Sequence, residues 1–340
     1  MTEKHKADSI PGTFMGLFIM LGLAFVAALG FGAIRLSPAK ALSALFGKGN
    51  DDVAALIVDL RLLRACLAAS TGAALAASGA VFQGLFRNPL ADPYVIGSSG
   101  GAAFGAVCAI ALGWSQGALG FSAIGFAAFL GGMAATLVVY IIAGIGRLKS
   151  DPASLLLAGT ALSSLFSALV SIIIALKDKS LHQAWFWLLG GFSGRGYREL
   201  SASAPAMLIG FLLSLASSRQ LDLLAVGDEE AMSLGMRPDM VRILVGSFTA
   251  LSVSAAVALA GAIGFVGLVA PHLARRMVGP KHLRLIPASA LVGASLLVLA
   301  DTLARTAFAP VELPVGAMTA LIGAPYFMYK IARRGLEGLK

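Results

Sequence analysis

Long stretches without a charged residue dominate this chain of 340 residues. A helix that crosses the hydrocarbon core of a bilayer needs about 20 consecutive apolar residues. Eight uncharged runs approach or exceed that length, at 10–34, 65–86, 93–146, 152–176, 200–218, 243–274, 285–300 and 313–329. The sequence therefore predicts an all-α membrane protein.

Two of these runs are too long for a single membrane helix. The run 93–146 has a natural break at 114–117, with the sequence Trp-Ser-Gln-Gly, and the run 243–274 has a glycine-rich break at 261–264. Dividing both runs gives ten transmembrane helices in one domain, residues 1–340. Because ten is even, both termini are expected on the same side of the membrane.

Composition supports a membrane protein and argues against a nucleic-acid-binding one. The chain is 58% hydrophobic and 13% charged, whereas soluble domains average about 25% charged residues. The formal net charge is +9, and few of the charges fall inside the apolar runs, so they are expected in loops that set orientation. Cys66 and Cys108, the two cysteines, lie in apolar runs, which predicts neither a disulfide framework nor a metal site.

The distribution of Lys and Arg predicts that both termini are cytoplasmic. With that orientation most of the 26 Lys and Arg residues fall on the cytoplasmic side. The outer positive charges are concentrated in the segments 35–64 and 177–198. This concentration indicates an outer docking surface, with a solvated loop as the alternative.

The chain lacks the features of a self-powered transporter. It has no G-x-x-x-x-G-K-S/T loop for a nucleotide. The central parts of its predicted helices contain neither paired carboxylates nor a histidine relay, which proton-coupled carriers usually need. The energy source is therefore expected in another polypeptide, or transport is passive.

The segment 220–236, QLDLLAVGDEEAMSLGM, is expected to contact a partner. Asp228 is predicted to cap a short helix whose first turn carries Glu229 and Glu230. Leucine and methionine side chains on either side supply apolar anchors for a groove. The alternative is a helix lying on lipid, but lipid-binding faces are usually rich in Lys and Arg, and this one is acidic.

Several motifs together resemble the permeases of the iron-siderophore, haem and vitamin B12 family of ABC importers. They include ASGAVFQGLFRNPLADPYVIG, WFWLLGGF, GAIGFVGLVAPHLAR and VELPVGAMTALIGAP. They follow the family order over nearly the whole chain, at 77–97, 155–169, 185–192, 223–236, 261–275, 299–306 and 311–325. The family has ten helices and cytoplasmic termini, as the hydropathy pattern predicts independently.

The resemblance implies a set of partners and sites. It implies a homodimer in the inner membrane, two cytoplasmic ATP-binding subunits, and a periplasmic or lipoprotein substrate-binding protein. The contact with the ATPase is expected at Gly227, Asp228, Glu229, Ala231, Leu234 and Gly235. Docking of the binding protein is expected at Arg61, Arg64 and Arg305, although Leu63 stands where the family motif Arg-Leu-Pro-Arg has proline.

Some residues have plainer interpretations. Arg305 can pair with Asp301 at i, i+4 within one helix, with or without a docking role. His272 is expected to be a structural or hydrogen-bonding residue, because no second ligand is spaced for a metal. No catalytic residue, cofactor or metal is predicted.

The substrate is left open among an iron chelate, haem and a corrinoid, with molybdate as a further candidate. Trp185, Phe186 and Trp187 face either the transport pathway or a membrane interface. The rival functions are a secondary carrier or passive channel, and a structural membrane scaffold. A neighbouring ATPase and binding-protein gene would favour the importer, and loss of uptake on deletion would exclude the scaffold.

Overall fold

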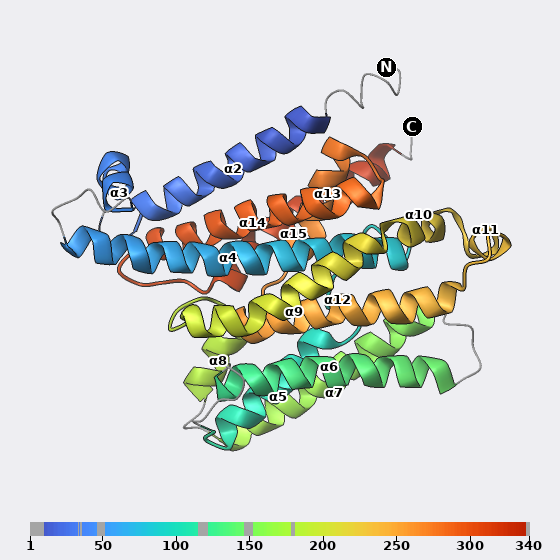
Figure 1. Ribbon diagram of the computed structural model, residues 1–340. Coiled ribbons are helices and arrows are strands. Elements are labelled where there is room, and N and C mark those ends of the chain that lie inside the picture. Colours follow the sequence, from blue (N-terminus) through green and yellow to red (C-terminus); the bar gives the residue numbers. More distant parts are fainter. Residues whose placement is uncertain are drawn as a thin grey trace.

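The computed structural model describes residues 10–32, 34, 36–45, 52–114, 122–145, 152–177 and 181–337. Within these residues the regular structure is entirely α-helical (Figure 1). The helices are α2 (Ile10–Gly30), α3 (Pro38–Leu45), α4 (Asp52–Leu85), α5 (Ser98–Ala111), α6 (Ala123–Ile145), α7 (Pro152–Leu176), α8 (Leu181–Leu189), α9 (Tyr197–Ala216), α10 (Ser218–Val226), α11 (Asp228–Ser233), α12 (Pro238–Ala260), α13 (Val266–Val278), α14 (His282–Thr306) and α15 (Val315–Glu337).

Each apolar segment expected from the sequence contains a helix, namely α2, α4, α5, α6, α7, α9, α12, α13, α14 or α15. Among the described residues, α2, α7, α9, α12, α14 and the Ala123–Ala143 part of α6 are long and apolar enough to cross a membrane. The expected break at 261–264 is confirmed, because α12 ends at Ala260 and α13 starts at Val266. Of the expected break at 114–117, only Trp114 lies within the described residues, and it follows the end of α5 at Ala111. At the break 261–264, Gly261 has a φ of 73°, a backbone conformation that favours glycine.

Helix α4 starts much earlier than its apolar run predicted. It begins at Asp52 rather than near residue 65. The hydropathy pattern missed the segment 52–64 because its charged side chains interrupt the apolar run. Ala54 and Val58 are nevertheless buried, so this extension packs against the rest of the protein. The extension matters for function, because it carries Arg61 and Arg64.

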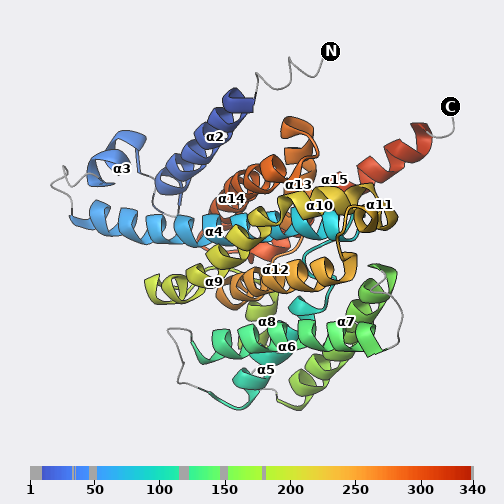
Figure 2. The same cartoon turned by 45° about the vertical axis from the view of Figure 1, so that its right-hand side comes forward.

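Helices α4, α12 and α14 form the centre of the bundle. α4 packs along α14, and α12 packs against α4, α6 and α9. In Figures 1 and 2, α5, α6 and α7 lie on one side of α12, and α2 lies on the far side of α4. One continuous cluster of buried apolar side chains joins these helices.

Glycines allow α4 to approach its neighbours closely. A Cβ added to Gly79 would collide with the carbonyl oxygen of Gly267 in α13, and one added to Gly72 would collide with that of Gly293 in α14. Small residues at such contacts let helix backbones touch, which stabilises helix pairs in lipid through van der Waals packing.

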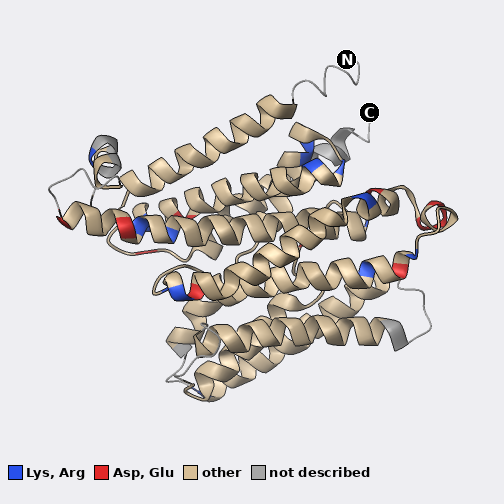
Figure 3. Ribbon diagram, in the orientation of Figure 1, with Lys and Arg blue, Asp and Glu red and all other residues tan. Residues whose placement is uncertain are grey.

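Among the described residues, charged residues lie mainly near the two ends of the bundle, and its middle is almost free of them (Figure 3). One end carries α10 and α11, together with the start of α2 and the end of α15 (Figure 1). The other end carries α3 and α8. We refer to these as the α11 end and the α8 end.

We predict that Gly79→Ala destabilises the protein by about 1–3 kcal/mol, because the added methyl group meets backbone rather than a movable side chain. Gly22→Ala in α2 is the matched control, since a Cβ there meets nothing within 4 Å. Thermal unfolding in lipid nanodiscs measures both. Equal unfolding temperatures for the two variants would contradict the close α4–α13 contact.

Candidate functional site

A buried carboxylate organises the α8 end. Asp301 of α14 is 1% exposed. Arg64 of α4 donates from Nε to both carboxylate oxygens, at 3.0 and 3.1 Å, and its Nη2 lies 3.0 Å from Oδ1. A buried charge is tolerated when it is paired and hydrogen-bonded in this way. The pair therefore fixes α4 against α14.

Two further arginines bind backbone carbonyls at the C-terminal end of α2. Arg305 places Nε 3.2 Å from Oδ2 of Asp301, which confirms the expected i, i+4 pair, and donates from Nη2 to the carbonyl of Ala28 at 3.2 Å. Arg61 donates from Nη1 to the carbonyl of Leu29 at 2.7 Å and from Nη2 to that of Ile34. The bonds to Ala28 and Leu29 satisfy carbonyls in the last turn of α2, which a helix C-terminus leaves without partners.

The three arginines expected to dock a partner thus lie at one end, but they are not equally accessible. Arg61 and Arg305 are each 8% exposed, and their guanidinium groups contact the protein's own carbonyls. Arg64 has a side chain 16% exposed. The sequence located the arginines at this end, but it could not show that α2 would cover two of them.

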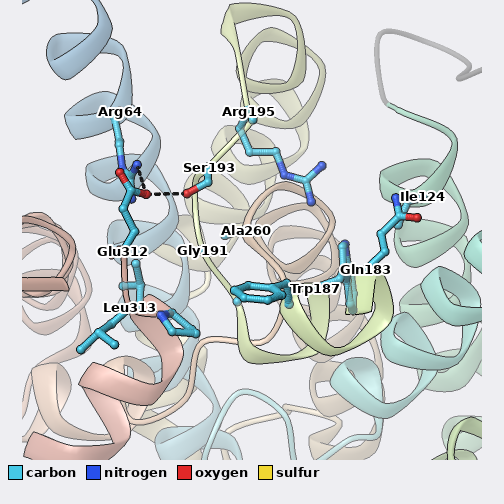
Figure 4. Close-up of a pocket in the computed structure, with 15 residues that line it drawn as sticks. Arg64, Ile124, Gln183, Trp187, Gly191, Ser193, Arg195, Ala260, Glu312 and Leu313 are labelled. Atoms are coloured by element: carbon cyan, nitrogen blue, oxygen red, sulfur yellow. Dashed lines mark hydrogen bonds and ion pairs between the residues drawn. The ribbon is translucent and has the colours of Figure 1, made fainter. Parts of the chain in front are cut away.

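Glu312 and Ser193 extend the network, and sequence reasoning assigned them no role. Arg64 Nη1 lies 2.9 Å from Oε2 of Glu312, and the Ser193 hydroxyl donates to the same oxygen at 2.8 Å (Figure 4). Partial burial alone would raise the pKa of the Glu312 carboxyl. The bonds from Ser193 and Arg64 outweigh that effect and lower its pKa below the ordinary value.

Beside this network lies a cavity of about 360 Å³, which we call the α8 cavity. Its polar lining consists of Arg64, Gln183, Trp187, Ser193, Arg195 and Glu312 (Figure 4). Trp187 is 7% exposed and faces the cavity, whereas Trp185 and Phe186 are 58% and 51% exposed. The three neighbouring aromatic residues therefore have different surroundings.

At the α11 end, Asp228 has a different role from the one predicted. The residue that precedes α11 is Gly227, and the Asp228 side chain does not cap the helix. Instead, Oδ1 of Asp228 lies 2.6 Å from Nη2 of the buried Arg242 and 3.1 Å from Nη2 of Arg87. The prediction of a capping role is wrong because two arginines bind the carboxylate.

The other expected contact residues of α11 divide into buried and exposed groups. Gly227 and Ala231 are buried. Gly235 ends the segment with a φ of 80°. Glu229 and Leu234 are exposed, and Leu234 is 69% exposed.

Exposed Val226 and Met232 lie in the same segment. The surface of α11 is therefore acidic and apolar, as the sequence predicted, and it suits a protein groove better than anionic lipid.

Two histidines lie near the α11 end of the core. His282 Nδ1 is 2.6 Å from Oδ1 of Asp222, a contact that joins α10 to the start of α14. His272 Nε2 is buried and has no hydrogen-bond partner among the described residues. No group of three or more potential metal ligands occurs in the described part of the chain.

These features define the class as an all-helical, multi-pass membrane protein with charged surfaces at both ends. The FecCD transport family matches residues 20–333, and the chain belongs to that family. It is thus a permease of the ABC-importer type.

Two curated relatives show the range of the family. The cobalamin import permease BtuC of Halobacterium salinarum is 42% identical, over 86% of this chain and 77% of the relative. The hemin transport permease HmuU of Yersinia pestis is 39% identical over 94% of each chain.

A solved structure has the same fold. An inward-facing, metal-chelate-type ABC transporter superposes with a TM-score of 0.84 at 35% identity, covering 95% of this chain and 99% of the other.

We predict that Asp301→Ala destabilises the protein by about 3–5 kcal/mol, because it leaves buried positive charge without its counter-charge. Asp239→Ala is the control, since Asp239 also pairs with an arginine on its own helix but has a side chain 51% exposed. Its cost is expected at roughly 0–1 kcal/mol. Chemical unfolding in detergent measures both, and equal costs would contradict the organising role of Asp301.

Proposed function

We propose that this permease imports an iron chelate, haem or cobalamin as a homodimer, driven by two separate cytoplasmic ATPases and supplied by a periplasmic or lipoprotein substrate-binding protein. The observation that carries the proposal is the family match over residues 20–333. It is supported by relatives named as permeases for cobalamin, hemin and ferric citrate. A molybdate permease of Haemophilus influenzae, 37% identical, keeps an oxyanion as the second candidate substrate.

We propose ten transmembrane helices with both termini cytoplasmic, in the inner membrane. The helices at the ten expected positions support this count. The start of α2 and the end of α15 lie at the α11 end (Figure 1), which supports an even number of crossings. In this orientation the α11 end faces the cytoplasm and the α8 end faces outward.

The ATPase contact is proposed at Gly227, Asp228, Glu229, Ala231, Leu234 and Gly235. The exposed acid Glu229 and the exposed apolar side chain Leu234 would enter the partner's groove. Asp228 would hold α11 in place through Arg242 and Arg87 rather than contact the ATPase itself. Ala231 and the two glycines would set the position and the end of the helix.

A second copy of the permease is proposed to cover α7. This helix is apolar, and it is the least buried of the six long apolar helices among the described residues. Of an apolar stretch of 18 residues in it, 11% is buried inside the protein. Leu157 and Leu165 are 72% and 54% exposed. A symmetric homodimer would place two such faces around a shared axis, where a pathway can form.

The binding protein is proposed to dock on the α8 end around Arg61, Arg64 and Arg305. Arg64 is the most exposed of the three arginines, with a side chain 16% exposed, and the buried Arg61 and Arg305 add positive potential from beneath. An acidic partner would be steered by this potential, which affects the association rate more than the final affinity. The adjacent Glu312 opposes the effect with its negative charge.

The coupling proposal predicts that Glu229→Lys combined with Leu234→Asp reduces ATP-driven uptake at least tenfold. Both side chains are exposed, so folding is retained while the charge and the apolar anchor that fit the groove are lost. Leu112→Asp is the control, because Leu112 is 67% exposed and follows α5, away from α11.

Uptake into proteoliposomes is measured with and without ATP inside. Normal uptake by the double variant would remove α11 from coupling. Uptake by the unaltered protein without ATP would favour the secondary carrier or channel.

The docking proposal predicts opposite effects from two neighbouring substitutions. At low salt, Arg64→Gln slows association of the folded permease with the binding protein several-fold, because it removes an attractive charge. The same substitution also destabilises the permease, because the buried Asp301 loses its partner. Glu312→Gln accelerates association, because it removes a repulsive charge. Both effects shrink as salt screens them. Stopped-flow association rates across a salt series test this, and changes of the same sign in both variants would exclude electrostatic docking here.

A further inference from the structure

Arg195 lies in the wall of the α8 cavity. It belongs to the loop 190–196 between α8 and α9, which turns at Gly190 and Gly194, each with a φ of 72°. Phe192 is 2% exposed and anchors this loop in the core. In Figure 4 the Arg195 guanidinium extends into the space between Trp187 and Gln183. The loop therefore places a positively charged side chain at the cavity.

No acceptor within the described residues binds the Arg195 guanidinium, in contrast to Arg64 on the opposite wall. The nearby carboxylate of Glu199 accepts the backbone N–H of Gly196 at 2.9 Å. Burial lowers the pKa of Arg195, and Glu199 offsets only part of that effect. The group still remains charged at neutral pH, and an anion in the cavity would stabilise it.

A second polar side chain lines the same cavity. Gln183, from helix α8, adds an amide to this wall. The indole Nε1 of Trp187 is buried and closed off from the cavity, so Trp187 contributes an apolar surface to the lining. The cavity thus offers a guanidinium and an amide to an acceptor.

We propose that the α8 cavity binds a carboxylate of the transported substrate, with Arg195 as its charged anchor and Gln183 as an additional donor. This inference rests on the proposed import function and narrows its substrate class to chelates with free carboxylates. A guanidinium matches the planar carboxylate with two parallel bonds, and such charge-assisted bonds are the strong ones. A neutral corrinoid offers no such group.

The volume of the cavity fits a small ligand, or one arm of a larger ligand. Ligand pockets usually measure about 300–1,000 Å³, and this one measures about 360 Å³. It has room for a small chelate or for one carboxylate-bearing arm of a larger one. An acidic side chain of the binding protein would present the same chemistry, so the experiment has to separate these two sources.

The test measures equilibrium binding of ferric citrate, as the anionic probe, and cyanocobalamin, as the probe without a free carboxylate. The full chain is used in lipid nanodiscs. We expect Arg195→Gln to weaken ferric citrate binding roughly tenfold or more and to leave cyanocobalamin binding unchanged. Arg195→Lys should retain part of the affinity, because it keeps the positive charge. Arg198→Gln, at a neighbouring exposed arginine, is the control.

Three results would overturn the proposal. They are absence of ferric citrate binding to the unaltered protein, unchanged binding in Arg195→Gln, and equal weakening for both probes. Slower docking of the binding protein to Arg195→Gln, with ferric citrate binding intact, would assign the arginine to protein docking instead. ATP-driven uptake by the unaltered protein is measured separately, so a failure of the import function is distinguished from a failure of this site.

Discussion

The close contact of α4 with α13 and α14 is the constraint on which the rest of the structure depends. Glycine pairs bring the backbones together, at Gly79 with Gly267 and at Gly72 with Gly293. In lipid this packing has to replace a hydrophobic driving force between helices. At the α8 end the same helices are joined by the Arg64–Asp301 pair, whose strength derives from its burial. Packing thus sets the distance between these helices, and the ion pair adds directional bonds at one end.

Each charged end contains a buried charged residue that is paired with side chains of opposite charge. The sign of the buried charge differs between the two ends. At the α8 end a buried acid, Asp301, holds arginines, and at the α11 end a buried arginine, Arg242, holds Asp228. In each case the charges nearest the core satisfy one another, and charges farther out stay available to partners. This division explains why residues of one sequence motif differ in exposure, as Asp228 and Leu234 do. Substitutions at the buried Asp301 or Arg242 therefore test stability, whereas substitutions at the exposed Glu229 or Leu234 test function.

The sequence predicted the helical segments well because their apolar runs are uncharged, and the break at 261–264 because glycines interrupt the apolar run there. It misplaced the start of α4, where charged residues continue a helix that hydropathy alone would end. It also misjudged Asp228, because Arg87 is far away in sequence and Arg242 lies on the next helix, α12, and only the fold brings the three together. The α8 cavity could not be predicted for the same reason, since its walls come from α4, α6, α8, α12 and the segments before α9 and α15.

Helix α12 connects the two ends through contacts that are short and well defined. Near its start, Arg242 holds Asp228 at 2.6 Å, beside α11. At its last residue, the carbonyl of Ala260 accepts the N–H of Gly191 at 2.7 Å, and Ala260 itself lines the α8 cavity. Gly190 in turn accepts the N–H of Val315, at the start of α15. A displacement of α11 that carried α12 with it would therefore move the loop that holds Arg195. Such a path is a physical connection, and it becomes coupling only if the two ends favour different positions of α12.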